Sequence, residues 1–196
     1  MVNPIRSFIA IPLTIEIHRN LEAFIQAYGL NNRESGFRPV KPENIHLTLK
    51  FLGDVEPVRI PVISNQLEKV AKTFSPIKVS VRGLGAFPGW KKHPRVLWVG
   101  IQPLQQIQSI FHAVDRITTA LGFPPENKPF SPHLTLARVN QQSNNPRFDE
   151  TIDRMMNIEP EPVFGEMIAN EIILYKSLLQ PTGPVYTVLS RYAFIG

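Results

Sequence analysis

The sequence predicts an α+β fold made of two similar lobes, and three observations support this prediction. The tetrapeptide HLTL begins at His46 and again at His133, 87 residues further along the chain (133 − 46). Two similar apolar segments open at Arg6 and Arg95, which are 89 residues apart (95 − 6). The two halves also show the same order of expected strands and helices. Both spacings are close to half of the 196 residues, which indicates one duplicated unit with a period too long for a solenoid.

The duplication predicts how the lobes are arranged. Residues 1–196 are expected to form a single domain, with repeat units over approximately 5–90 and 94–196. We expect a duplicated two-lobed fold in which two mainly antiparallel sheets with outer helices surround a central cleft with pseudo-twofold symmetry. The antiparallel arrangement is favoured by the short connections expected near the C-terminus.

In the first half, apolar patterns and turn residues delimit the elements. Thr14 is suited to cap a helix, because its hydroxyl accepts a hydrogen bond from the first turn. Gly53 is expected to end a strand, and Pro57 is typical of the first turn of a helix. The expected elements are a strand over 6–13, a helix from Thr14 to about Tyr28, a basic loop over 31–44, a strand over 46–53, a helix from about 54 and a strand over 76–84.

The second half repeats this order and then adds two strands. Apolar residues at helical spacing predict its first helix, and alternating patterns predict its strands. The expected elements are a strand over 94–101, a helix from about Leu104 to Leu121, a strand over 133–138, a helix over 147–156, and strands over 162–168, 170–178 and 185–194.

The composition excludes several kinds of chemistry. The chain has no cysteine, which rules out disulfides, thiolate metal sites and cysteine nucleophiles. No apolar run approaches the roughly 18 residues that span a bilayer, and no signal peptide is expected. We therefore expect a soluble cytoplasmic protein that does not bind membranes. The net charge of +5 favours partners that are rich in phosphate.

The two HLTL motifs carry the candidate catalytic residues. In a strand, alternate side chains share a face, which groups His46 with Thr48 and Lys50. The same alternation groups His133 with Thr135. The leucines between them take the other face and anchor each strand to the core. If a pseudo-twofold axis relates the lobes, the two polar faces point at each other across the cleft.

Two imidazoles and two hydroxyls around one small ligand suit phosphodiester hydrolysis without a metal. In-line attack at phosphorus needs a base for the water and an acid for the leaving oxygen, and histidine serves as either near neutral pH. The threonine hydroxyls are suited to bind non-bridging phosphate oxygens. A structural strand histidine explains a single motif well, but two copies at half-chain spacing favour a catalytic pair.

The other histidines carry weaker signals. His18 flanks the apolar stripe of its helix and His112 falls on the side of its helix away from the apolar residues, so both are interpreted as solvated. His93 lies in the basic segment GWKKHPR, which is either a solvated loop or part of a phosphate-binding rim.

These motifs resemble those of the two-histidine (2H) phosphoesterase superfamily. The paired HLTL motifs, the opening RSFIAIPL, the PRVLWVG strand and the SPHLTLAR segment carry the resemblance, which covers essentially the whole chain. Within the superfamily the sequence is most similar to the LigT-like RNA 2′,3′-cyclic phosphodiesterases, formerly called 2′-5′ RNA ligases. The resemblance implies hydrolysis of a terminal 2′,3′-cyclic phosphate to a 2′-phosphate without a metal or other cofactor. It also implies ATP-independent ligation as a possible reverse reaction.

The resemblance further implies roles for individual residues. His46 corresponds to the proton donor for the leaving 3′ oxygen and His133 to the proton acceptor that activates water, roles that the sequence alone does not distinguish. Thr48 and Thr135 correspond to phosphate-binding positions. Arg138 matches a phosphate-contacting arginine. Strict alternation places Arg138 on the face opposite His133, so a β-bulge or the strand end has to redirect it.

Basic and aromatic residues in the loops near the motifs are candidates for a rim that contacts the substrate. Phe130 and Trp90 are candidate platforms for a base, although packing against the core also explains both, and is favoured for Phe130. The candidate rim residues are Arg33, Arg38, Lys41, Trp90, Lys91, Lys92, His93, Arg95 and Phe130.

Three other classes of protein compete with this prediction. A metal hydrolase is disfavoured because neither motif has an adjacent Asp, Glu or third His, and a P-loop kinase or ligase because G-x-x-x-x-G-K-[ST] is absent. A non-catalytic module that binds an RNA end or a nucleotide in the same cleft is the alternative that stays open. The expected partner is RNA with a 2′,3′-cyclic phosphate end or a cyclic nucleotide, and the expected oligomeric state is a monomer.

Overall fold

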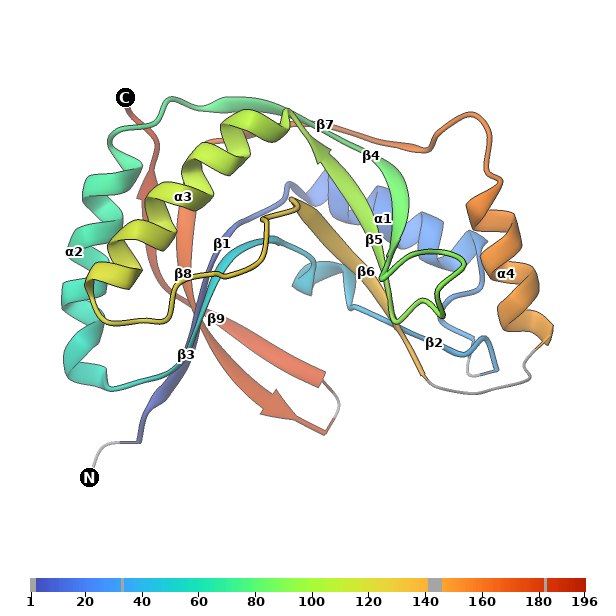
Figure 1. The fold of residues 1–196 in the computed structure, drawn as a ribbon, viewed down its shortest axis with the longest axis horizontal. Helices are drawn as coiled ribbons and strands as arrows, with labels where there is room; N and C mark the ends of the chain where they lie inside the picture. The colour runs from blue at the N-terminus through green and yellow to red at the C-terminus, as the bar shows by residue number, and fades with distance from the viewer. Residues whose placement is uncertain (1–2, 33, 141–145, 182) are drawn as a thin grey trace.

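Nine antiparallel strands form one sheet in the computed structural model, which describes residues 3–32, 34–140, 146–181 and 183–196 (Figure 1). The strand order is β7-β4-β5-β6-β3-β1-β8-β9, and β2 pairs with β6 beside this path. The strands are β1 (Ile5–Ile11), β2 (Phe37–Pro39), β3 (Leu47–Val55), β4 (Ile77–Phe87), β5 (Val96–Gln102), β6 (His133–Val139), β7 (Val163–Ala169), β8 (Glu171–Gln180) and β9 (Gly183–Ala193).

The strand order is symmetric about the contact between β6 and β3, the strands that carry the two HLTL motifs. We call β3, β1, β8 and β9 the β3 half, and β6, β5, β4, β7 and β2 the β6 half. One registered pair, Leu47 with Leu134, joins the halves, so the two expected sheets are continuous at this point. The expected duplicated α+β architecture is confirmed. Each half of the sheet takes strands from both halves of the chain, since β4 pairs with β5 while β8 pairs with β1.

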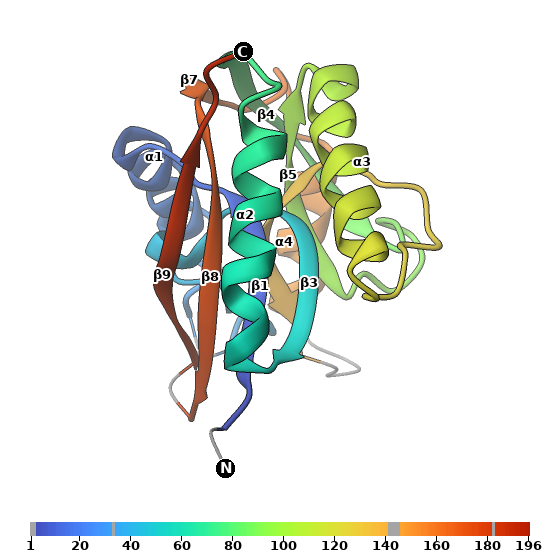
Figure 2. The same ribbon diagram turned by 90° about the vertical axis from the view of Figure 1, so that its left-hand side faces the viewer.

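Two α-helices pack on each half of the sheet (Figures 1 and 2). Helices α2 and α3 pack on the β3 half, where α3 contacts β3 and α2 contacts β8 and β9. Helices α1 and α4 pack on the β6 half, where α1 contacts β7 and α4 contacts β4. Their bounds are α1 (Ile15–Ala27), α2 (Ile60–Ala71), α3 (Leu104–Ala120) and α4 (Pro146–Met156), and the short 3-10 helices are η1 (Pro42–Asn44) and η2 (Pro57–Arg59).

Local signals place most element boundaries correctly. The Thr14 hydroxyl accepts a hydrogen bond from the Ile17 amide at 3.5 Å and caps α1, as the sequence predicts. Helix α2 was expected from about residue 54, but it begins at Ile60. Strand β3 continues to Val55, and Pro57 opens η2 instead of the α-helix. The loop expected over 31–44 contains the short strand β2, whose pairing with β6 has no local signature.

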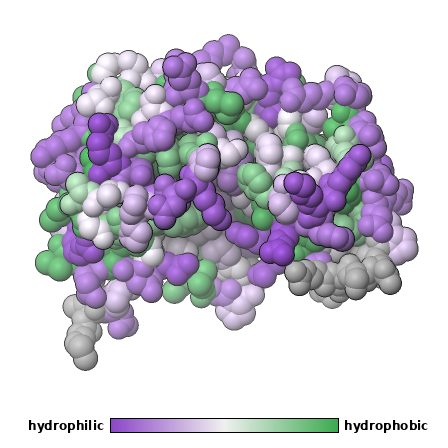
Figure 3. Space-filling model, viewed as in Figure 1, coloured by the Kyte–Doolittle hydropathy of each residue, from purple (hydrophilic) through white to green (hydrophobic). Residues whose placement is uncertain are grey.

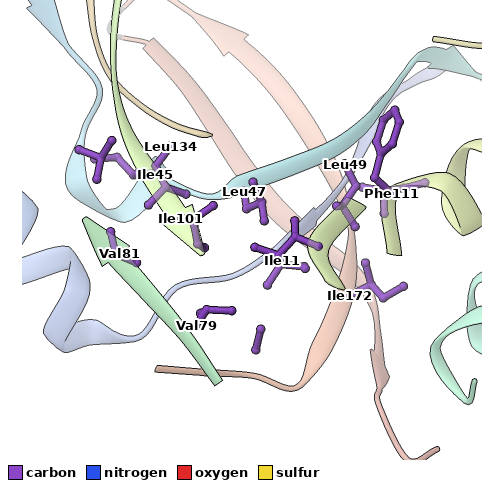
Figure 4. Packing of buried hydrophobic residues seen from close by; sticks show 14 of the residues in the cluster. Ile11, Ile45, Leu47, Leu49, Val79, Val81, Ile101, Phe111, Leu134 and Ile172 are labelled. Atoms are coloured by element: carbon purple, nitrogen blue, oxygen red, sulfur yellow. The ribbon is translucent and has the colours of Figure 1, made fainter. Parts of the chain in front are cut away.

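The core is continuous beneath the junction of the two halves. Leu47 is 1% exposed and Leu134 is 0% exposed, and both project into the same apolar cluster as Ile11 and Ile101 (Figure 4). Because the motif strand of each half packs on this cluster, core packing sets the relative position of the two motifs. No helix in the described parts of the chain is long and apolar enough to cross a membrane.

Candidate active site

The two HLTL motifs meet where β3 crosses β6. Leu47 lies opposite Leu134, and continuing this antiparallel register places His46 opposite Thr135 and Thr48 opposite His133. The two leucines point into the core, so alternation directs the four polar side chains, all of them half-buried, to the other face. In a regular sheet such diagonal neighbours are about 7–8 Å apart, which is close enough to bracket one phosphate. The molecular surface is recessed between the two halves (Figure 3).

Both histidine rings are held by a backbone group two residues earlier in the chain. The Nδ1 atom of His133 lies 2.7 Å from the carbonyl oxygen of Ser131. His46 is hydrogen-bonded in the same way to the backbone of Asn44. A carbonyl acceptor fixes a proton on Nδ1 of His133, so Nε2 of the neutral ring is the nitrogen with a free lone pair.

The ring environments of the two histidines differ. His46 stacks on Phe8 at a centroid distance of 4.7 Å and makes a T-shaped contact with Tyr186 at a centroid distance of 5.3 Å. His133 instead makes T-shaped contacts with Phe87 and Trp98, at centroid distances of 5.0 Å and 6.4 Å. The duplicated motif therefore has two chemically distinct imidazoles.

Burial shifts the titration of His46. Desolvation lowers the pKa of His46 from 6.5 to about 4, while the hydrogen bond to the Asn44 backbone raises it and the nearby His18 lowers it further. Near pH 7 the unliganded His46 is therefore neutral. The interpretation of His18 as solvated is wrong, because its ring is half-buried and its Nε2 lies 3.1 Å from the carbonyl oxygen of Ile45.

Each motif strand contains a β-bulge at the last letter of HLTL. In β3, Leu49 is the extra residue, since Thr48 and Lys50 pair with successive residues of β1. In β6, Leu136 is the extra residue against β5, again 87 positions later (136 − 49). A bulge of this kind reverses the alternation of side chains beyond it.

The bulge in β3 moves Lys50 away from the motif face. The expectation that Lys50 shares a face with His46 is wrong. The Lys50 side chain is 2% exposed and points to the helix side, where its ammonium group donates to Asp115 Oδ1 at 2.6 Å and to the Pro124 carbonyl at 2.6 Å. Glu126 Oε1 lies 3.6 Å away. Lys50 thus ties β3 to α3 and to the chain that leads into the second motif.

The bulge in β6 has the opposite consequence for Arg138. Strict alternation would place Arg138 on the face opposite His133. The extra residue Leu136 reverses this, so Arg138 shares the motif face with His133. The positive charge of Arg138 lowers the pKa of Tyr186, which burial raises, so the guanidinium lies within electrostatic range of the β3 half. Arg38 of β2 is the registered partner of Arg138. Two arginines therefore lie side by side near the motifs, and neither has an ion pair among the described residues.

The other candidate rim residues are either packed against the core or exposed. Phe130 stacks on Phe111 with ring centroids 3.9 Å apart, which is core packing, and Trp90 also packs against the core. His93 is exposed with a φ of 50°. Arg33 lies outside the described residues. The remaining candidates, Lys41, Lys91, Lys92 and Arg95, have exposed side chains.

Sequence reasoning missed the aromatic residues that surround the two histidines. Phe8, Tyr175 and Tyr186 come from three strands of the β3 half, and Phe87 and Trp98 from two strands of the β6 half. Their proximity to the histidines depends on the sheet order, for which no local pattern exists. Trp98 is the registered partner of Thr135, and its buried Nε1 has no hydrogen-bond partner among the described residues.

Comparison with known proteins identifies the family. The family model of LigT-like phosphoesterases matches the chain twice, over residues 11–98 and 99–186. The chain belongs to this family. Among the described residues of this LigT-like protein, no group of three or more His, Asp or Glu side chains is placed to hold a metal ion.

Relatives of this LigT-like chain are similar over nearly their full length. An RNA 2′,3′-cyclic phosphodiesterase of Methanothermobacter thermautotrophicus is 31% identical, with 93% of this chain and 95% of the relative aligned. One of Methanocaldococcus jannaschii is 32% identical over 92% and 98% of the two chains. A crystal structure of a Thermus thermophilus protein matches with a TM-score of 0.74 and 29% identity, covering 97% and 98% of the chains. E. coli LigT complexed with 3′-AMP matches with a TM-score of 0.76 and 25% identity over 98% and 99%.

Proposed function

We propose that this chain hydrolyses 2′,3′-cyclic phosphates at RNA ends or on nucleotides to 2′-phosphomonoesters. The observation that carries the proposal is the pairing of Leu47 with Leu134, which brings two His-Thr pairs onto one face around a common centre. The curated relatives named as RNA 2′,3′-cyclic phosphodiesterases support the same reaction. The expected single domain over 1–196, with repeats over 5–90 and 94–196, is part of the proposal, because each repeat supplies one motif.

The two histidines divide the proton transfers. His133 accepts a proton from the attacking water through Nε2, since its Nδ1 is held at the Ser131 carbonyl. The new bond forms between the water oxygen and phosphorus, and the bond from phosphorus to the 3′ oxygen breaks. His46 donates a proton to that leaving oxygen. The product is a 2′-phosphate beside a free 3′ hydroxyl, and the reaction consumes one water.

Binding of the substrate favours the protonated form that His46 needs in order to act as an acid. His46 is neutral near pH 7 in the free protein, because burial lowers its pKa to about 4. A phosphodiester anion that binds beside the ring favours the imidazolium form and raises this pKa. Proton donation by His46 thus requires a bound phosphate.

Hydroxyl and guanidinium groups complete the phosphate site. Thr135 lies opposite His46 and Thr48 lies opposite His133. Both hydroxyls donate hydrogen bonds to the non-bridging oxygens of the phosphate. Arg138 stabilises negative charge that develops on them. Its registered partner Arg38 belongs to the same electropositive edge, and two adjacent cations that lack carboxylate partners favour an anionic ligand.

The protein is proposed to act as a cytoplasmic monomer on RNA ends, without a cofactor. Joining a cyclic-phosphate end to a 5′ hydroxyl is the reverse of the same chemistry, with the hydroxyl in place of water, and needs no ATP. A module that binds RNA ends without cleaving them is the competing function, and it would use the same face.

Turnover of adenosine 2′,3′-cyclic phosphate tests the proposal. The wild type is expected to form adenosine 2′-phosphate at the same rate with and without excess chelator. His46→Ala and His133→Ala are each expected to lose at least about a hundredfold in kcat. His112→Ala is the matched control, because its ring is exposed on α3. Binding of the cyclic nucleotide without turnover by the wild type would establish the non-catalytic alternative.

A further inference from the structure

The segment that leads into the second HLTL motif has no helix or strand of its own. Residues 121–132 connect α3 to β6, and most of their side chains are exposed. The end of this segment supplies the carbonyl oxygen of Ser131, which lies 2.7 Å from Nδ1 of His133. The orientation of the His133 ring therefore depends on how the segment is held.

The ammonium group of Lys50 holds the segment. It donates to the Pro124 carbonyl and to Asp115 Oδ1, both at 2.6 Å. The same Oδ1 atom accepts a hydrogen bond from the Glu126 amide at 3.2 Å. Lys50 belongs to β3 and Asp115 to α3, so these three bonds join the segment both to the first motif strand and to the helix. We call Lys50, Asp115 and the backbone at Pro124 and Glu126 the lysine clamp.

A second anchor lies next to Ser131. Phe130 stacks on Phe111 of α3 with ring centroids 3.9 Å apart, and its carbonyl accepts from Gln108 Nε2 at 3.4 Å. That hydrogen bond is long, so it restrains the peptide only weakly. Residues 124–131 are thus tied at both ends, and loss of the clamp would return backbone freedom to them. We expect the Ser131 carbonyl to lose its fixed direction when the clamp is removed.

The second motif strand has no equivalent of the buried cation. The position 87 residues after Lys50 is Ala137, which is 0% exposed (137 − 50). Burying a charge costs desolvation free energy, and apolar residues often stabilise such a position equally well. The ammonium group is therefore not explained by stability alone. It reaches from the strand of the first motif to the segment that holds the histidine of the second.

We propose that Lys50 is a positioning residue for His133, the general base of the proposed reaction. The clamp fixes the segment, the Ser131 carbonyl keeps the proton on Nδ1, and the Nε2 lone pair accepts the proton of the attacking water. Lys50 itself does not contact the substrate, because its side chain is 2% exposed and points to the helix side. The inference rests on the proposed function and makes the first motif strand control the histidine of the second.

Turnover of adenosine 2′,3′-cyclic phosphate by the double variant Lys50→Met, Asp115→Leu tests the proposal. This variant removes the clamp without leaving a buried charge unpaired, so it is expected to fold. We expect kcat to fall about tenfold, because the base loses its reactive orientation. KM should stay unchanged, because the groups proposed to bind the phosphate are untouched.

A matched control separates this effect from a loss of stability. Met155 is 2% exposed on α4, which lies at the other end of the molecule from α3 (Figure 1). Met155→Ala removes a buried side chain and destabilises the protein. Its kcat is expected to equal that of the wild type.

Nitrogen-15 NMR of the His133 ring provides a readout that a merely structural role would not change. In the wild type and in Met155→Ala, the neutral ring is expected to carry its proton on Nδ1. In the double variant, a mixture of the two tautomers is expected. An unchanged tautomer or an unchanged kcat in the double variant would overturn the proposal.

A change in the segment itself tests the clamp without touching the ion pair of Lys50 and Asp115. Glu126→Pro removes the amide that donates to Asp115, whereas Glu126→Ala keeps it. The kcat of Glu126→Pro is expected to fall below that of Glu126→Ala, with a corresponding mixture of tautomers. Equal kcat values and equal tautomer populations would show that the clamp does not act through the segment, which also overturns the proposal.

The NMR measurement distinguishes failure of the proposal from failure of the proposed function, because it needs no turnover. If the wild type hydrolyses no cyclic phosphate but the tautomer changes in the double variant, hydrolysis is wrong and the positioning of His133 by Lys50 stands. If the wild type hydrolyses the substrate and the tautomer does not change in the double variant, the positioning role is wrong.

Discussion

The imidazole of His46 stacks on the ring of Phe8, with centroids 4.7 Å apart and planes inclined by 24°. This contact buries one of the two motif histidines against an apolar surface, which disfavours its charged form. The protein therefore holds neutral a group that the proposed reaction needs protonated. The stability and the chemistry of the protein are coupled at this residue.

The first prediction concerns stability against pH. The pKa of His46 falls from 6.5 to about 4 on folding, so the unfolded chain binds more protons between these values. The free energy of unfolding is then expected to fall by about 3 kcal/mol as the pH drops from 7 to 4. Urea unfolding at several pH values measures this slope. His46→Gln should flatten it and His112→Gln should not, and equal slopes in all three proteins would contradict the low pKa.

The second prediction separates acid from base. A nitrophenyl phosphodiester has a leaving group that departs without a proton, so loss of the general acid costs little on this substrate. We expect His46→Ala to retain most of the wild-type kcat on the nitrophenyl ester while losing about a hundredfold on the cyclic nucleotide. His133→Ala should be impaired on both substrates. The reverse pattern would exchange the two roles.

A third prediction concerns the buried ammonium group of Lys50. Lys50→Met leaves Asp115 facing an apolar neighbour and is expected to cost about 3 kcal/mol of stability. Adding Asp115→Leu removes the stranded carboxylate and should recover most of that loss. Denaturant unfolding of the two single variants and the double variant measures the free energy of unfolding of each. A double variant whose loss equals the sum of the two single losses would mean that Lys50 and Asp115 are not coupled.

The fourth prediction uses the side-by-side arrangement of Arg38 and Arg138. Like charges on registered positions destabilise a sheet by a few tenths to about 1 kcal/mol, so Arg38→Met should not lower the melting temperature in phosphate-free buffer. The same change should raise KM for RNA ends, most strongly at low salt. Arg116→Met on α3 serves as the remote control. An unchanged KM at low salt would remove Arg38 from the substrate site.

Local sequence patterns were sufficient to predict helix caps and the face that neighbouring side chains share on a regular strand. The cap at Thr14 and the common face of each His-Thr pair belong to this group, because both depend on neighbours a few residues away. The start of α2 was misplaced, because Pro57 is equally compatible with the first turn of a 3-10 helix.

Beyond a β-bulge, strand alternation no longer predicts which face of the sheet a side chain takes. Lys50 and Arg138 were both placed by the same rule, and the extra residues Leu49 and Leu136 reversed the outcome for each. A bulge is a property of the pairing with the neighbouring strand, so its position is not encoded in the alternation of one strand.

The sequence by itself determined the duplication, the two His-Thr pairs and the family to which the chain belongs, because repeated motifs and their spacing are visible in one dimension. Only the tertiary structure decided which residues surround those pairs. Phe8, Phe51 and Tyr186 line one slot although they are far apart in the chain, since the sheet order brings β3, β1, β8 and β9 together. Contacts of this kind arise from the packing of whole strands onto a shared core, which no local pattern specifies.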